Sequence, residues 1–74
     1  MQREFGVIVR FFADRSPCYG FIQPDVIGDD IFLSERALQE AGIVEPVEPG
    51  TRISYESRPS KKTGRLQAWN VTVE

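Results

Sequence analysis

Short segments rich in β-branched and aromatic residues, separated by turn residues, recur along this chain of 74 residues. Such segments are typical of β-strands, and the glycine, proline and aspartate residues between them are typical of turns. The segments occupy residues 5–12, 19–23, 30–34, 51–56 and 66–73. The sequence therefore predicts an all-β fold with five short strands, the first three of which form a meander.

The longest connection, between the third and fourth strands, carries the signals of a short helix. Ser34 is a favourable N-cap residue, residues 35–41 are mostly good helix formers, and Gly42 is a favourable stop. Residues 43–50 contain two prolines and predict a loop. Because an open sheet would leave strand edges unpaired, we expect a five-stranded antiparallel OB-fold barrel with a short helical turn between strands 3 and 4.

Length and composition restrict the class of protein. A chain of this size forms one domain, here residues 1–74, and buries only about 60% of its unfolded surface. Its 41% hydrophobic and 27% charged residues are ordinary for a globular protein. No apolar run reaches the roughly 20 residues of a membrane span, and the first residues do not resemble a secretion signal. We therefore expect a cytoplasmic protein without membrane contact.

The residues that most often perform catalysis or bind metals are scarce. The chain has no histidine, and its single cysteine, Cys18, has no internal disulfide partner and belongs to no zinc set. Serine nucleophiles would have only carboxylates and lysines as bases, and the adjacent Asp29 and Asp30 are more typical of a turn than of an acid–base pair. We expect no enzymatic activity, no cofactor and no metal. We also expect a monomer, with weak dimerisation as the alternative.

Alternation along the second and third strands separates two kinds of side chain, because residues i and i+2 share a face. One face carries Tyr19, Phe21, Phe32 and Ser34. The other face carries Ile22, Ile31 and Leu33. Aromatic residues that alternate along a strand more often belong to a core. Here the aliphatic face already supplies the core, so we expect the rings to form an exposed platform.

Five short motifs, taken in order, resemble the cold-shock domain. They are VRFF (9–12), YGFI (19–22), DIFLSERAL (30–38), EPGTRISYE (48–56) and QAWNV (67–71). The resemblance extends over about residues 6–73. It implies a barrel that binds single-stranded RNA or DNA with low sequence specificity through stacking on strands 1 to 3, as a cold-shock-like protein or RNA chaperone.

The resemblance also implies the residues of the nucleic-acid site. Tyr19, Phe21 and Phe32 match the phenylalanines of the two ribonucleoprotein motifs, and Asp30 matches an aspartate that can accept a hydrogen bond from a base edge. The basic loop from residue 57 to residue 65 would border the platform, although a solvated hairpin tip is the alternative. The expected nucleic-acid-binding set is Arg10, Phe11, Phe12, Tyr19, Phe21, Asp30, Phe32, Ser34, Lys61, Lys62 and Arg65.

Several positions depart from the family pattern. Ser34 replaces a histidine, Glu35 stands where an aromatic residue is frequent, and Ile43 stands where a loop phenylalanine is common. Trp69 replaces a small residue, and strand alternation would place it on one face with Val71, which favours core packing over stacking. The net charge of −2 is also unusual for a nucleic-acid binder. These departures leave a second hypothesis open: an OB-fold protein-interaction module that has lost strong nucleic-acid binding.

Overall fold

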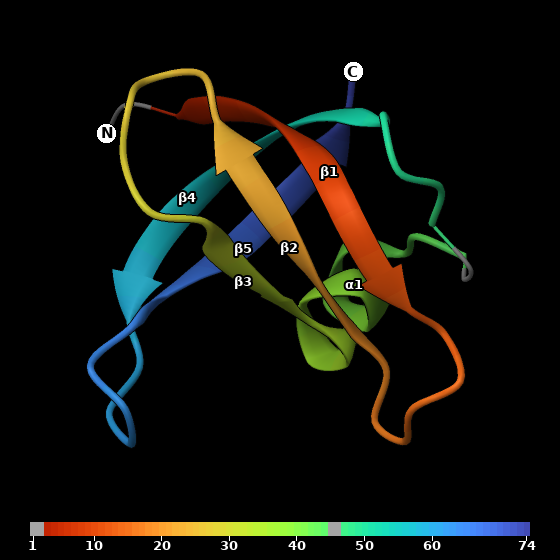
Figure 1. Ribbon diagram of the computed structural model, residues 1–74. Helices are drawn as coiled ribbons and strands as arrows, with labels where there is room; N and C mark the ends of the chain where they lie inside the picture. The colour runs from red at the N-terminus through yellow and green to blue at the C-terminus, as the bar shows by residue number, and fades with distance from the viewer. Residues whose placement is uncertain (1–2, 45–46) are drawn as a thin grey trace.

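The computed structural model describes residues 3–44 and 47–74. Figure 1 shows its elements: β1 (Glu4–Phe12), β2 (Tyr19–Pro24), β3 (Ile31–Ser34), α1 (Glu35–Ala41), β4 (Arg52–Pro59) and β5 (Leu66–Val73). The predicted all-β fold and the predicted short helix are confirmed. The loop predicted over residues 43–50 includes residues 45 and 46, which lie outside the described residues.

Strand β4 is longer than the sequence predicts. We expected it to end at Glu56, but Ser57, Arg58 and Pro59 continue the pairing with β5. Pro59 is tolerated because it is the last residue of the strand, where its missing N–H removes no central ladder bond. The basic loop is therefore shorter than predicted, and it forms the tip of the β4–β5 hairpin.

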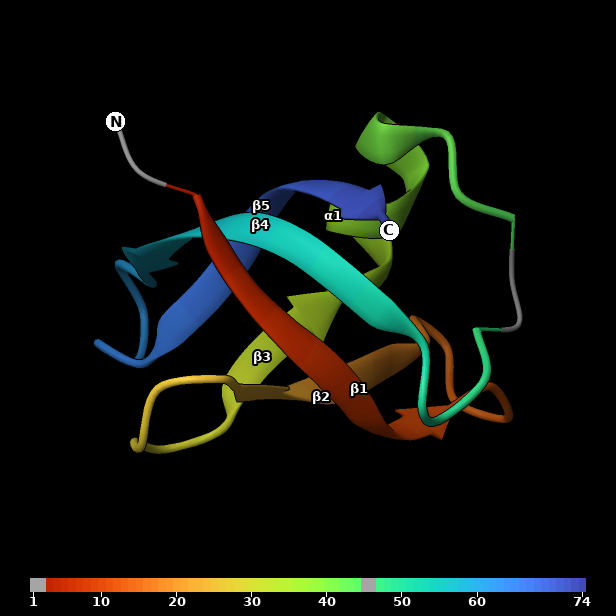
Figure 2. The ribbon, with the colours of Figure 1, turned by 90° about the horizontal axis from the view of Figure 1, so that it is seen from above.

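The strands close into a barrel in the order β1-β2-β3-β5-β4. Neighbouring strands are antiparallel except for β3 and β5, which are parallel. A closed ring with an odd number of strands cannot alternate in direction throughout, so one parallel pair is required. In Figure 1, β1, β2 and β3 form the front of the barrel, and β4 and β5 form the back. Figure 2 shows the same barrel from above.

Strand β1 belongs to both walls of the barrel. Residues 4–7 pair with β4 and residues 6–12 with β2, and the register of β1 and β2 shifts between Ile8 and Arg10. Such a bulge bends a strand and increases its twist, which lets one strand turn the corner between two walls. Gly6 lies near this corner, and a Cβ there would lie 2.6 Å from the carbonyl oxygen of Gln23. Only glycine allows this close approach of β1 to β2.

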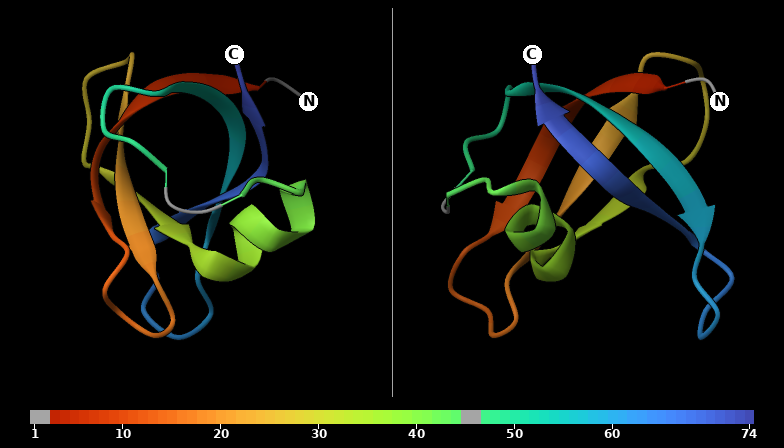
Figure 3. Two further views of the ribbon diagram at one scale, coloured as in Figure 1. Left: turned by 90° about the vertical axis from the view of Figure 1, so that its right-hand side faces the viewer. Right: turned by 180° about the vertical axis from the view of Figure 1, so that it is seen from behind.

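The barrel interior is filled by aliphatic side chains and one tyrosine. Its fully buried large side chains are Ile8, Ile22, Leu33, Leu38, Ile53 and Tyr55. Helix α1 packs against β3 and β5 at one end of the barrel, where it contributes Ala37 and Leu38 to the core (Figure 3). Ile22, Ile31 and Leu33 are all buried, as the alternation of β2 and β3 predicts.

A bulge in β5 changes which of its side chains face the core. Asn70 has a positive φ of 50°, and the register of β4 and β5 shifts beside it. Ala68 and Val71 are consequently both buried, although they are three residues apart. The expectation that Trp69 shares a face with Val71 was therefore wrong, because alternation is interrupted at Asn70. Trp69 nevertheless packs against the core, partly buried.

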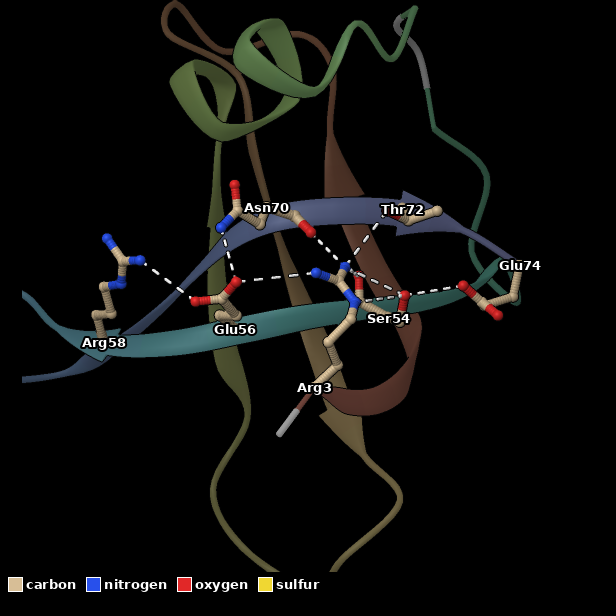
Figure 4. A network of polar contacts seen from close by, with 7 residues as sticks. All are labelled: Arg3, Ser54, Glu56, Arg58, Asn70, Thr72 and Glu74. Carbon is tan, nitrogen blue, oxygen red and sulfur yellow. Dashed lines mark hydrogen bonds and ion pairs between the residues drawn. The ribbon is translucent and has the colours of Figure 1, made fainter. Parts of the chain in front are cut away.

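Polar contacts from the N-terminal segment hold this bulge (Figure 4). Arg3 donates to the carbonyl oxygen of Ser54 at 3.0 Å and to the carbonyl oxygen of Asn70. Its guanidinium also lies 3.9 Å from the carboxylate of Glu56, which accepts the side-chain amide of Asn70 at 2.7 Å. The guanidinium thus links β4 and β5 on the outside of the barrel, at the residues where their regular pairing is broken.

Candidate nucleic-acid interface

Four aromatic rings form one cluster on β1, β2 and β3. The ring cluster consists of Phe12, Tyr19, Phe21 and Phe32. The centroids of Phe12 and Tyr19 are 4.9 Å apart, and Tyr19 stacks on Phe32 at 5.7 Å. Phe21 lies edge-on to Phe32 at 5.9 Å, to Tyr19 at 6.0 Å and to Phe12 at 6.4 Å. These are favourable offset and edge-to-face geometries, so the rings support one another.

The strand register brings the four rings together. Phe12 lies opposite Tyr19 in the β1–β2 pair, and Phe21 lies opposite Phe32 in the β2–β3 pair. Cross-strand neighbours in such positions are close enough for their side chains to touch. On the other face of β2, Ile22 is 0% exposed within the core. The rings therefore lie on the outer face of the barrel wall, where each remains half-buried.

A hollow of about 470 Å³ adjoins the ring cluster on the side of the β4–β5 hairpin. Phe21 and Phe32 line it together with Asp30, Arg65 and Gln67. A larger adjoining hollow of about 810 Å³ also reaches Phe21, Asp30 and Arg65, and it adds Arg10. The structure thus brings three of the predicted polar residues, Arg10, Asp30 and Arg65, beside the rings.

A separate hollow of about 410 Å³ adjoins the other end of the ring cluster, next to α1. We call it the Glu35 hollow. Its lining residues are Pro17, Cys18, Tyr19, Phe32, Ser34, Glu35, Arg36 and Gln39. The hollow therefore combines two aromatic residues with polar side chains from the first turns of the helix.

Glu35 connects α1 to the loop that precedes β2. Its Oε2 accepts the backbone N–H of Cys18 at 3.0 Å, and its Oε1 accepts the side-chain amide of Gln39 at 3.3 Å. The hydrogen bond from Cys18 lowers the pKa of Glu35 below its ordinary value, because it favours the charged carboxylate. Cys18 is 2% exposed. The loop that leads to Tyr19 is thereby held against the helix.

Two predicted site residues have structural contacts instead of a place in the ring cluster. Phe11 packs against the core, over Gly20, where a Cβ would lie 2.9 Å from the Phe11 ring. The Oγ of Ser34 accepts the N–H of Ala37 at 3.1 Å and so caps α1. Both residues therefore support the site from beneath or beside it.

The two predicted lysines are not among the residues that line the three hollows described above. Lys61 and Lys62 are exposed in the hairpin loop. Arg65, at the other end of the same loop, does adjoin Phe21 and Phe32. The hairpin therefore brings one cation to the rings and leaves the two lysines at its tip.

Some residues beside the rings were missed by the sequence analysis. The guanidinium of Arg15 lies 5.9 Å from the centre of the Phe12 ring, which is a cation–π distance. Gln39 and Gln67 line hollows at opposite ends of the ring cluster. Arg15 and Gln39 belong to none of the five motifs, whereas Gln67 is the first residue of the QAWNV motif and was not assigned to the site. The only available signal for Arg15 was its place in the loop directly after the first strand.

The part of the chain that the structure describes contains no group of three or more acidic, cysteine or histidine side chains placed to hold a metal ion. Nor does any described helix have the length and apolar character needed to cross a bilayer.

The barrel is small and closed, with five strands and a helix between its third and fourth strands, and it carries a cluster of half-buried rings on the first three strands. These features define a protein of the OB-fold class. No family model matches the chain. Over 53 residues the chain is 40% identical to "Probable cold shock protein y4cH" of Sinorhizobium fredii (strain NBRC 101917 / NGR234). The aligned region covers 72% of this chain and 75% of that protein. It is 36% identical to "Cold shock protein CspA" of Rhizobium meliloti (strain 1021), over an aligned region of the same length that covers the same fractions of the two chains. The chain belongs to the cold-shock protein family.

Proposed function

We propose that this protein binds single-stranded RNA or DNA with low sequence specificity through the ring cluster. The observation that carries the proposal is a cluster of four mutually supported, half-buried rings on the outer face of β1, β2 and β3. Every base has a π-face, and stacking one base on an aromatic side chain is worth about 1–3 kcal/mol without reading its identity. Membership of the cold-shock protein family supports the same function.

Charged residues around the rings fit a secondary role in this proposal. Arg10, Arg15 and Arg65 lie beside the rings. We propose that they contact phosphates of a strand that crosses the rings. Asp30 offers a carboxylate to the edge of a stacked base. Phe11 and Ser34 would act by supporting the site, and Lys61 and Lys62 by attracting the strand from a distance. Stacking, and not phosphate neutralisation, would then supply most of the affinity.

The biological role that follows is that of an RNA chaperone. A strand whose bases are stacked on the protein cannot pair with another strand. We propose that residues 1–74 act in this way as one monomeric domain in the cytoplasm, without catalysis. The competing hypothesis, a protein-interaction module, requires no nucleic-acid affinity.

The direct test is a titration of a labelled thymine oligonucleotide, followed by fluorescence anisotropy at about 50 mM and 200 mM salt. We expect binding of the single strand, little binding of the matching duplex, and a loss of affinity in Phe32→Ala. Val44→Ala is the control, because Val44 is exposed and lines no hollow beside the rings. Absence of binding at the lower salt concentration would contradict the proposal and favour the protein-interaction module.

A further inference from the structure

The Glu35 hollow has a chemical character that the rest of the site lacks. Tyr19 and Phe32 line it with aromatic rings, and Glu35 and Gln39 line it with hydrogen-bonding groups. A base that stacks at this end of the ring cluster would have its edge within reach of those polar groups. The hollow is therefore able to read the identity of a base, which stacking alone does not do.

The Glu35 carboxylate is held in position before any ligand binds. The Cys18 N–H fixes one oxygen at 3.0 Å, and the Gln39 amide fixes the other at 3.3 Å. The Cys18 side chain also hydrogen-bonds this carboxylate. A carboxylate has about four lone-pair sites, so two are open to a base when the thiol, which is a weak donor, gives way. Preorganised groups of this kind lose little conformational entropy when a ligand binds.

The edges of the bases differ in how well their hydrogen-bonding groups match the two oxygens of a carboxylate, both of which are acceptors. Guanine presents two neighbouring donors, N1–H and the N2 amino group, on its Watson–Crick edge. Adenine and cytosine each place one amino donor beside an acceptor nitrogen, and thymine and uracil place a single N–H between carbonyl oxygens. Single-stranded nucleic acid exposes these edges for reading. A carboxylate thus pairs fully with guanine alone and repels at least one atom of each other base.

We propose that the Glu35 hollow is a base-specific pocket for guanine, in which the Glu35 carboxylate accepts N1–H and N2–H while the base stacks on Tyr19 or Phe32. This inference rests on the proposed function, since it requires that a single strand cross the ring cluster. It makes Glu35 a specificity-determining residue. It also assigns the neighbouring Gln39 and the Cys18 N–H the role of positioning the carboxylate.

The expected size of the preference follows from one bidentate contact. Such a contact discriminates against the wrong base by roughly 5- to 150-fold. Glu35 is partly exposed to water, so we expect the lower part of this range. An oligonucleotide of about eight thymines, within the site size of an OB fold, should bind about tenfold more tightly when one central thymine is replaced by guanine. Replacement by adenine or cytosine should have a smaller effect.

The test compares affinities of wild-type protein, Glu35→Gln and Glu48→Gln for the thymine and guanine oligonucleotides. Glu48→Gln is the control, because it removes the same charge at an exposed residue that does not line the Glu35 hollow. Both variants should bind the thymine oligonucleotide at least as well as wild type, since each removes one negative charge. Only Glu35→Gln should lose the preference for guanine.

A second measurement needs no variant and so does not depend on the folding of Glu35→Gln. Inosine lacks the N2 amino group of guanine but keeps N1–H, so the wild-type protein should prefer guanine to inosine several-fold. Equal affinities for guanine, inosine and thymine would overturn the pocket while leaving the ring cluster as the binding site. A guanine preference that persists in Glu35→Gln would also overturn it. Failure to bind every oligonucleotide would instead contradict the proposed function itself.

Discussion

Phe21 and Ile22 are neighbours in β2, yet their side chains lie on opposite sides of the barrel wall. Ile22 is 0% exposed and packs in the core, whereas the Phe21 ring meets Phe32 edge-on at 5.9 Å on the outer face. Strand alternation produces this separation. It assigns the two residues different roles, the aliphatic one in stability and the aromatic one in the proposed binding.

Replacing each of these residues by alanine should therefore give different results. Phe21→Ala should weaken binding of a single-stranded oligonucleotide by about 1–3 kcal/mol, the value of one stacked base. Ile22→Ala should instead lower the free energy of unfolding by about 2–5 kcal/mol, because it opens a cavity in the core. Urea denaturation and anisotropy titrations of both variants measure the two effects. Equal destabilisation by the two substitutions would show that Phe21 also belongs to the core.

The two strands on which the rings depend were predictable because their alternation is uninterrupted. Ile22, Ile31 and Leu33 face inward in the structure as the sequence analysis expected, and Tyr19 and Phe21 face the other way. The same reasoning failed for Trp69, because a bulge inserts an extra residue at Asn70 and shifts the phase of the strand. Alternation alone does not reveal a bulge.

Contacts between residues far apart in the chain were also beyond the sequence analysis. Glu35 and Cys18 belong to no common motif, and their hydrogen bond exists because the barrel brings the start of α1 against the β1–β2 loop. Phe11 was assigned to the site by its place in a motif. In the structure its side chain packs against the core, where β1 has a bulge after Ile8 and Gly20 lies close to the Phe11 ring. Register, and not residue type, decides such contacts.

The basic residues should differ in their effect on salt dependence. For a single strand, the logarithm of affinity should fall with a slope of about −0.7 per neutralised phosphate, and we expect two or three such contacts, or roughly −1.4 to −2.1 in all. Arg65 adjoins the rings, whereas Lys61 lies at the hairpin tip. Arg65→Gln should therefore reduce the slope by about 0.7, and Lys61→Gln should change it little. If the salt-dependence slope is steep in the wild type and becomes much shallower in Lys61→Gln, the main site lies on the hairpin.

Asn70 should contribute to stability through its backbone conformation. Its φ of 50° lies in the left-handed region, which costs most residues roughly 1–2 kcal/mol but is tolerated by asparagine and glycine. Asn70→Ala should lower the free energy of unfolding by about that amount plus the loss of the hydrogen bond to Glu56. Asn70→Gly removes the same bond without the strain, so it should be less destabilising. Equal losses would show that the hydrogen bond alone matters.

Glu56 should make the barrel more sensitive to acid. Its hydrogen bond from Asn70, together with the nearby guanidinium of Arg58, holds the pKa of its carboxyl below the ordinary value of 4.5. A lowered pKa in the folded state means that this stabilisation is present above pH 4.5 and is lost as the pH falls through the folded-state pKa. Glu56→Gln should be less stable than wild type at pH 7 and should lose less stability on acidification. Thermal unfolding between neutral and acidic pH tests both points.

The hydroxyl of Tyr55 is buried inside the barrel. Its side chain is 0% exposed, and its Oη has no hydrogen-bond partner among the described residues. A buried polar group without a partner costs about 1–3 kcal/mol, so Tyr55→Phe should raise the free energy of unfolding, by roughly 1 kcal/mol once the lost packing is subtracted. Tyr19→Phe, which removes a hydroxyl from the half-buried ring cluster, is the control and should change stability little.

Alkaline pH provides an independent measurement of the same side chain. Burial, and secondarily the charges of Glu4 and Asp25, raises the pKa of Tyr55 from 10.0 to about 12. Because the raised value belongs to the folded state, ionisation of this phenol favours unfolding. Wild-type stability should therefore be intact below pH 10 and should fall as the pH rises toward 12. Tyr55→Phe should lose less stability over this interval. A variant that is less stable than wild type at pH 7 and equally sensitive to alkali would show that the hydroxyl is satisfied inside the barrel.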